Sequence, residues 1–427
     1  MDAGKGEPTV LDDLVQKQST RIRHRASLFG PYLDDYLVDL RRGGYGRKVL
    51  RRNVSLITRL GEYIAEQGVR DVGGVRREHV ATFLQCERAR LERTSSTPAR
   101  LASVARHILD GLQRHLEARG ILCRPQPPAL GMIDEFCRSL AVDRGLQPCT
   151  VEGYRHFIDQ FLRHLGSDGS VASLSRVRLE DVDGFIVAAG GTYCRRSMGH
   201  ACTAVRGLLR FLYRANVLGQ DLSTAVVRPW FYALERLPCA LPWETVRRVL
   251  DAVDLSTAAG RRDRAILMLL VTYGVRPGEV VKLRLEDIAW RRDVIRFRRS
   301  KNGRPIFFPL TRDVGEAIAA YLRQGRPPTT AREVFIRVHA PHVALGRGSV
   351  VSGLVRQYLA RAGIQSRHTG AYVIRHSLAV HLLRKRHPLK TITDMLGHRD
   401  PSVAYHYAKL DTEDLRDVAL EVREVLP

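Results

Sequence analysis

The first half of this 427-residue chain carries one helical pattern twice. The stretch "YLDDYLVDL" (32–40) spaces its apolar residues three and four apart, and "MIDEFCRSL" (132–140) repeats that spacing. Later segments correspond in the same order: 56–64 with 157–165, 75–84 with 177–186, and 108–122 with 204–218. Because the order is kept at an offset of about one hundred residues, we predict two related helical modules of about four helices each.

Proline-rich segments separate these modules from each other and from the rest of the chain. One is "CRPQPPALG" (123–131), and the other lies within "STAVVRPWFYALERLPCALP" (223–242). We therefore expect four parts: an N-terminal tail at 1–29, a first helical module at 30–122, a second helical module at 130–220 and a C-terminal domain at 238–427.

The C-terminal domain is expected to mix helices with a short hairpin. A buried helix, "RRDRAILMLLVTYG" (261–274), is followed by Pro277, which favours the first turn of a new helix. Two strand-like segments flank "SKNG" (300–303), and Asn-Gly between apolar runs is typical of a β-hairpin. Helical spacing then resumes up to a last helix at 412–426. The predicted fold class is mainly α with a small β-hairpin or sheet in the C-terminal domain: two helical modules followed by an α+β domain.

The composition favours a polyanionic partner. Lys and Arg total 69 against 45 acidic residues, which gives a net charge of +24 and a pI near 10.3. Nucleic acid is the commonest partner for such a charge, although a generally basic proteome would have the same effect. No apolar run is long enough to span a membrane, and the N-terminus lacks a signal-peptide pattern. Seven scattered cysteines without a CxxC motif indicate reduced thiols in the cytoplasm.

Several kinds of catalysis have no motif here. The chain lacks the GxxxxGK[ST] loop of nucleotide hydrolases, and it lacks HExxH or a Cys/His cluster. No acidic group has the spacing of a two-metal nuclease, because "EDVD" at 180–183 repeats part of the first helical module. We therefore expect neither a metal nor a nucleotide cofactor.

Five residues remain that could act on a phosphodiester: Arg276, Lys301, Arg375, His398 and Tyr407. Cleavage without a metal needs fixed positive charge on the phosphate oxygens, which arginine supplies through a planar fork of donors. It also needs a nucleophile and a proton donor for the departing 5′ oxygen. A free phenol has a pKa near ~10, but clustered cations lower that pKa and stabilise the developing negative charge. A tyrosine among cations is therefore a reasonable covalent nucleophile.

Four local motifs carry a family resemblance. "TYGVRPGEVVKL" holds Arg276 and Glu279, "SKNGR" holds Lys301, and "AYVIRHSLAVHLL" surrounds Arg375. The fourth, "LGHRDPSVAYHYAKLD", holds a histidine and a tyrosine nine residues later. In this order they resemble the boxes of the tyrosine recombinases, the phage-integrase-type site-specific DNA recombinases. The match covers roughly 241–411.

The resemblance implies roles for the five candidates and for the modules. Tyr407 would attack the scissile phosphate, while Arg276, Arg375 and His398 would hold it and Lys301 would protonate the leaving oxygen. The second helical module is similar to the family's core-binding domain, and the first is a further copy of the same kind. The family also implies double-stranded DNA as substrate, a homo-tetramer at synapsis, possible sister recombinases, and a terminal helix that docks on a neighbouring protomer. We expect a cytoplasmic, nucleoid-associated integrase of a mobile element.

One position departs from the family pattern, and several alternatives stay open. Tyr372 stands where the HxxR box has its histidine, and it could either pack in the core or contact a phosphate. Tyr405 is a rival nucleophile, Arg276 could merely pair with Glu279, and Lys301 could simply be solvated. A non-catalytic DNA-binding homologue and a type IB-like topoisomerase are therefore alternative functions. The first module could extend the DNA contact or bind a sister protein.

Overall fold

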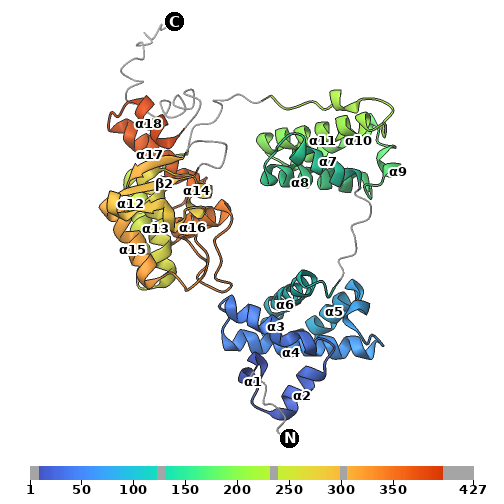
Figure 1. Cartoon of the computed structure of the whole chain (residues 1–427). Helices are drawn as coiled ribbons and strands as arrows, with labels where there is room; N and C mark the ends of the chain where they lie inside the picture. Colours follow the sequence, from blue (N-terminus) through green and yellow to red (C-terminus); the bar gives the residue numbers. More distant parts are fainter. Residues whose placement is uncertain (1–8, 123–130, 231–238, 299–304, 398–427) are drawn as a thin grey trace, which may run out of the picture. The chain divides into compact units, whose positions relative to one another are not determined.

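The computed structural model describes residues 9–122, 131–230, 239–298 and 305–397, and it is mainly helical (Figure 1). The chain divides into two compact units, one formed by Met1–Ala118 with Arg236–Pro427 and the other by Arg119–Glu235. The predicted fold class, mainly α with a small sheet in the C-terminal part, is confirmed.

The first helical group begins earlier than the sequence indicated. Its elements are α1 (Val10–Leu14), α2 (Gln18–Ala26), α3 (Gly30–Arg42), α4 (Arg47–Glu66), a 3-10 turn (Val72–Gly74), α5 (Arg77–Thr94) and α6 (Pro98–Ala118). Two of these helices lie in the stretch expected as a tail. Leu11 and Leu14 of α1 are buried in one cluster with Leu37 and Leu50. That apolar burial explains why so short a helix is held in place.

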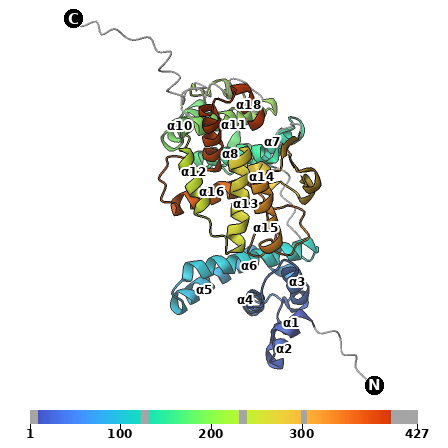
Figure 2. The same cartoon turned by 90° about the vertical axis from the view of Figure 1, so that its left-hand side faces the viewer.

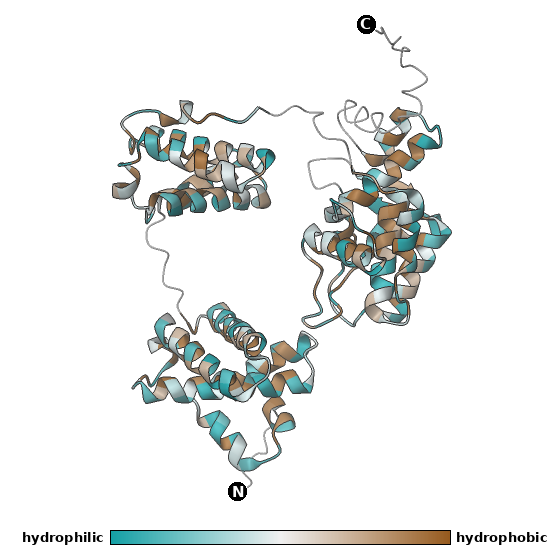
Figure 3. Ribbon diagram, turned by 180° about the vertical axis from the view of Figure 1, so that it is seen from behind, coloured by the Kyte–Doolittle hydropathy of each residue, from teal (hydrophilic) through white to brown (hydrophobic). Residues whose placement is uncertain are grey.

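The unit Arg119–Glu235 contains the second helical group. Its elements are α7 (Met132–Val142), α8 (Pro148–Leu165), α9 (Val171–Leu174), α10 (Leu179–Thr192), α11 (Arg195–Arg214) and a 3-10 turn (Leu222–Thr224). The buried apolar residues of these helices form one cluster, and brown segments recur along the helices of this unit (Figure 3). The apolar positions predicted from the sequence spacing therefore lie on the buried faces of these helices.

One contact between aromatic rings occurs at corresponding positions in both helical groups. In the first, Tyr36 and His115 have ring centroids 5.2 Å apart, and in the second Phe136 and Phe211 are 5.4 Å apart. Both contacts join the helix that opens the repeat to the helix that ends it. The repeat predicted from the sequence is thus a repeat of tertiary contacts.

A second contact pair joins the middle helices. The ring centroids of Tyr63 and Phe83 are 5.7 Å apart in the first group, and those of His164 and Phe185 are 5.8 Å apart in the second. The ring chemistry differs between copies, while the helices brought together correspond. Packing geometry is therefore better retained than residue type.

A glycine in the last helix of each copy makes room for the first helix. A Cβ on Gly111 would lie 2.7 Å from the hydroxyl oxygen of Tyr36, and one on Gly207 would lie 3.3 Å from a ring carbon of Phe136. Each glycine therefore sits where an aromatic side chain approaches the helix backbone.

Among its described residues, the C-terminal part combines seven α-helices with one small sheet. The elements are α12 (Trp243–Asp251), α13 (Ala258–Tyr273), α14 (Pro277–Val281), 3-10 turns at Leu285–Asp287 and Trp290–Arg292, β1 (Ile288–Ala289), β2 (Val294–Phe297), β3 (Ile306–Pro309), α15 (Arg312–Gln324), α16 (Gly348–Arg361), α17 (Ala371–Arg384) and α18 (Leu389–Leu396). The buried helix α13 lies alongside α15 in both views (Figures 1 and 2).

The predicted hairpin is present, and it gains a third strand. The sheet order is β1-β2-β3, all antiparallel, with Phe297 opposite Ile306. Tyr273, the last residue of α13, ties the sheet to the core because its hydroxyl donates to the carbonyl of Pro309 at 2.7 Å. The backbone N–H of Thr311 in turn donates to that hydroxyl at 3.1 Å. The sheet is therefore fixed to the helix that precedes Arg276.

Candidate functional site

Two arginines far apart in the sequence reach adjacent backbone carbonyls. Arg375 donates from Nη2 to the carbonyl oxygen of Leu396 at 2.5 Å and from Nη1 to that of Gly274 at 2.5 Å. Arg276 donates from Nη2 to the carbonyl oxygen of Gly397 at 3.3 Å. The tertiary structure thus brings both predicted arginines to the turn that ends α18.

Arg276 is held by a buried carboxylate. It is the residue before Pro277, at the N-cap of α14. Its Nη1 donates to Oε1 of Glu279 at 3.0 Å, while its backbone N–H donates to Oε2 of the same residue at 2.9 Å. The Glu279 side chain is only 4% exposed, whereas that of Arg276 is 30% exposed. The pairing with Glu279 and the approach to Gly397 coexist, because one guanidinium has several donors.

Arg375 is a buried cation between two helix ends. It lies on α17 with 3% of its surface exposed. Its carbonyl partners belong to the C-cap of α13, at Gly274, and to the last residue of α18, Leu396. A helix C-terminus carries partial negative charge, so these carbonyls offset part of the cost of burying the guanidinium. The side chain in this way joins the segment before Arg276 to the end of α18.

Gly274 permits this close approach. Its φ of +58° is in the left-handed region, and a Cβ there would lie 2.6 Å from Cδ2 of Leu396 and 3.0 Å from Cδ2 of Leu378. A larger residue would be strained by its backbone and would push α18 away. The glycine of the "TYGVRPG" motif therefore belongs to the packing between α13 and α18.

Tyr372 has its side chain outside the core. It lies on α17 three residues before Arg375, close to one helical turn, and it is 51% exposed. The Tyr372 side chain is therefore not packed in the core, which was one of the two alternatives for it. The phenol at the first turn of the helix is exposed to solvent.

Lys301, His398 and Tyr407 lie outside the described residues, as do Tyr405 and the helix expected at 412–426. The described residues do include the one directly before His398. Gly397, which receives the bond from Arg276, directly precedes His398 in sequence.

Asp287 anchors the hairpin, and sequence reasoning missed it. Its Oδ1 accepts from Nε and Nη2 of Arg296 at 2.8 and 2.5 Å and from Nε and Nη2 of Arg298 at 3.3 and 3.2 Å. The Asp287 side chain is 1% exposed. The available signal was the i, i+2 spacing of the two arginines, which puts them on one face of a strand. This ion-pair cluster fixes the end of β2 that leads toward the segment containing Lys301.

A second buried carboxylate is structural. Asp263 on α13 accepts from the hydroxyl of Tyr358 on α16 at 3.0 Å and pairs with Arg262 at 2.7 Å. Burial raises the pKa of Asp263, and burial together with the nearby carboxylate raises the pKa of Tyr358 to about 12. These groups tie α13 to α16.

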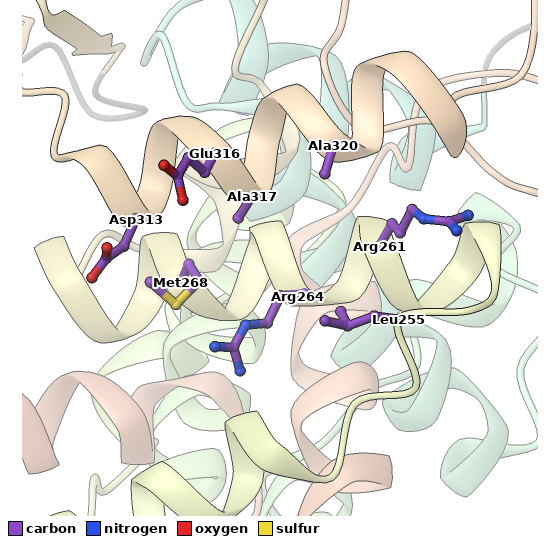
Figure 4. Close-up of a pocket in the computed structure, with 8 residues that line it drawn as sticks. All are labelled: Leu255, Arg261, Arg264, Met268, Asp313, Glu316, Ala317 and Ala320. Carbon is purple, nitrogen blue, oxygen red and sulfur yellow. The ribbon is translucent and has the colours of Figure 1, made fainter.

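A surface pocket lies between α13 and α15 (Figure 4). It is lined by Leu255, Arg261, Arg264, Met268, Asp313, Glu316, Ala317 and Ala320. Of the candidate residues that the structure describes, neither Arg276 nor Arg375 is among them. The described residues contain no group of His, Cys, Asp and Glu side chains placed to hold a metal. In the same part of the chain, no helix is long and apolar enough to cross a membrane.

Two family models match the chain. The model described as the phage integrase family matches residues 240–414, and the one described as the phage integrase N-terminal SAM-like domain matches residues 133–216. A putative integrase/recombinase, y4rA of Sinorhizobium fredii (strain NBRC 101917 / NGR234), is 33% identical over 390 residues, which cover 90% of this chain and 92% of that protein. The tyrosine recombinase XerD of Vibrio vulnificus (strain YJ016) is 28% identical over 293 residues, covering 67% and 93%.

Solved structures share the fold. The XerH site-specific recombinase bound to a palindromic difH substrate, in a post-cleavage complex, superposes with a TM-score of 0.51 at 18% identity. That match covers 69% of this chain and 84% of the other. At this identity the likeness concerns the arrangement of helices and sheet.

Proposed function

The chain belongs to the phage integrase family of tyrosine-type DNA recombinases, and from this premise we propose that it cuts and rejoins DNA through a 3′-phosphotyrosyl intermediate on Tyr407. Its substrate is double-stranded DNA at a specific site, and its biological setting is a mobile element. The name of the Sinorhizobium relative, an integrase/recombinase, supports integration as the class of reaction.

In the proposed step, the phenolic oxygen of Tyr407 forms a bond to the scissile phosphorus while the bond from phosphorus to the 5′ oxygen breaks. The phenol loses its proton to solvent, and Lys301 donates a proton to the departing 5′ oxygen. Arg276, Arg375 and His398 stabilise the charge on the non-bridging oxygens. The phosphoester is retained in the tyrosyl link, so rejoining is the reverse reaction with a new 5′-hydroxyl.

The observation that carries this proposal is the convergence of the two arginines on consecutive carbonyls. Arg375 bonds to Leu396 and Arg276 bonds to Gly397. His398 is the next residue, and the Tyr407 nucleophile follows it by nine positions. Both guanidinium groups therefore contact the segment that leads in sequence into His398 and Tyr407.

A nicked suicide substrate tests the proposal. The duplex releases a short strand after cleavage, so a covalent protein–DNA adduct accumulates and is counted on a denaturing gel. We expect an adduct with the unaltered chain and with Tyr405→Phe, and none with Tyr407→Phe. An adduct that persists in Tyr407→Phe and disappears in Tyr405→Phe would assign the reaction to the other phenol.

The exposed Tyr372 favours a second candidate function, that of a DNA-binding homologue that does not cleave DNA. A phenol is a poor general base at neutral pH, so the usual histidine chemistry is missing at this position. The same assay with Tyr372→His separates the candidates. An adduct formed only by Tyr372→His would support the non-cleaving function, whereas an adduct formed by the unaltered chain excludes it.

Assembly belongs to the same proposal. A lambda integrase tetramer bound to a Holliday junction is among the solved structures that share the fold, with a TM-score of 0.51 at 16% identity. We propose that this chain also acts as a tetramer on two DNA sites, and that it works in the cytoplasm on nucleoid DNA. Sedimentation with and without paired sites measures the assembly directly.

A further inference from the structure

The end of α3, the turn after it and most of α4 form the longest stretch of the first helical group without an acidic residue. Residues 40–61 contain seven Lys and Arg residues and no Asp or Glu. Six of the cations are exposed. Arg41 pairs with Asp13 at 3.2 Å, and the other five define what we call the α4 basic surface: Arg42, Arg47, Lys48, Arg51 and Arg52. The surface is therefore densely positive over about two helical turns.

The described partners leave most of this charge unneutralised. Arg47 and Arg51 donate to backbone carbonyls, of Asp13 at 2.7 Å and Leu14 at 2.9 Å, and not to carboxylates. Arg42 is 4.0 Å from Asp39, at the limit of an ion pair, and its side chain is 80% exposed. Within the described ranges, Lys48 and Arg52 have no acidic partner. The first turn of α4 also lacks acidic residues and a side-chain cap, so the helix end adds to the positive potential.

The second copy shows that the fold does not require these charges. The equivalent window, 141–162, contains two arginines and three acidic residues. The corresponding helices nevertheless form, and the two ring contacts recur in both copies. Like charges four residues apart on one helix, such as Lys48 and Arg52, destabilise it. The surface therefore carries an electrostatic cost that a polyanion would remove.

We propose that the α4 basic surface binds the phosphate backbone of DNA, so that the first helical group is a second DNA-contacting module. This proposal rests on the proposed function for its choice of DNA as the polyanion. The equivalent window of the second copy lacks the charge, so the contact belongs to the first copy alone. Backbone contacts of this kind add affinity without reading sequence.

The test is the salt dependence of binding, measured by fluorescence anisotropy with the full chain and a labelled duplex of random sequence. Each phosphate contact contributes about 0.9 to the slope of log affinity against log salt. We expect Lys48→Gln/Arg52→Gln to lower the slope by up to about 1.8. Lys48→Arg/Arg52→Lys keeps both charges and should keep the slope.

Arg100→Gln/Arg106→Gln is the matched control, since it removes the same charge from exposed positions on α6 of the same module. An unchanged slope in Lys48→Gln/Arg52→Gln, or an equal loss in the control, would overturn the proposal. Tyr407→Phe should bind with the full slope, because the surface does not depend on cleavage. If the unaltered chain forms no adduct with suicide DNA while the slope still falls, the proposed reaction fails and the DNA contact stands.

Discussion

Arg375 donates to the carbonyl oxygen of Leu396 at 2.5 Å, although 21 residues separate them and the guanidinium is almost completely buried. A second bond from the same fork reaches Gly274, 101 positions earlier in the chain. Such a side chain spans two helix ends with two parallel donors, and a point charge could not do the same. The relationship is therefore specific to arginine.

Arg375→Lys should consequently slow phosphotyrosyl adduct formation by about 10²-fold or more, in the range seen when one charge-stabilising donor is lost. The charge remains, but a single ammonium cannot reach both Gly274 and Leu396. Adduct formation in a single turnover on suicide DNA is the measurement. Arg384→Lys, an exposed position on the same helix, should keep the normal rate. Equal rates for both variants would show that the fork is not needed.

Gly274→Ala should destabilise the C-terminal domain by about 1–3 kcal/mol, because the positive φ and the contact with Leu396 are both unfavourable to a Cβ. Displacement of Leu396 should also lower the rate of adduct formation. Urea unfolding gives the free energy. Gly278→Ala on α14 is the control, since its Cβ would meet nothing within 4 Å. A neutral Gly274→Ala would contradict the packing described for α13 and α18.

Asp287→Asn should loosen the hairpin. The substitution removes the negative charge that Arg296 and Arg298 share, and we expect a loss of about 1–3 kcal/mol. Amide hydrogen exchange of β2 and β3 should become faster, and adduct formation should fall because Lys301 follows this strand. The control is Asp293→Asn, at an exposed turn position directly before β2, which should leave exchange unchanged because Asn tolerates the positive φ there. Protection of β2 that survives Asp287→Asn would show that the ion pairs do not anchor the strand.

The first helical group should lose stability in mild acid. His24 is 8% exposed, its Nδ1 lies 2.8 Å from the hydroxyl of Thr58, and burial together with Arg23 lowers its pKa. The unfolded chain therefore binds this proton more readily than the folded chain. The stabilising contribution is present above the unfolded pKa, near ~6.5, and is lost as the pH falls through the folded value.

Hydrogen exchange of α2 and α4 at pH 7.5 and at lower pH measures this effect. Protection should decrease on acidification in the unaltered chain, and the decrease should be smaller in His24→Gln. His107→Gln, an exposed histidine on α6, should behave like the unaltered chain. An acid response that is identical in all three would assign it to other groups.

The helical part of the fold was readable from local spacing. Apolar residues three and four apart predicted α3 and α7, and the same ring contacts, Tyr36 with His115 and Phe136 with Phe211, now join their helices to α6 and α11. The helices α1 and α2 were not foreseen, because both are short and α1 depends on burial against residues distant in sequence, such as Leu37. Short helices have little stability of their own, so only tertiary packing reveals them.

The sequence alone determined which side chains could act on a phosphate, because a phenol, a histidine and fixed guanidinium groups are chemical properties of single residues at readable intervals. Tertiary structure alone decided that Arg276 and Arg375 meet at the end of α18, and that Asp287 holds the hairpin through Arg296 and Arg298. Those partners are backbone carbonyls and a buried carboxylate. Every residue has a carbonyl, so no local pattern marks the ones that a guanidinium will find, and only the folded chain selects them.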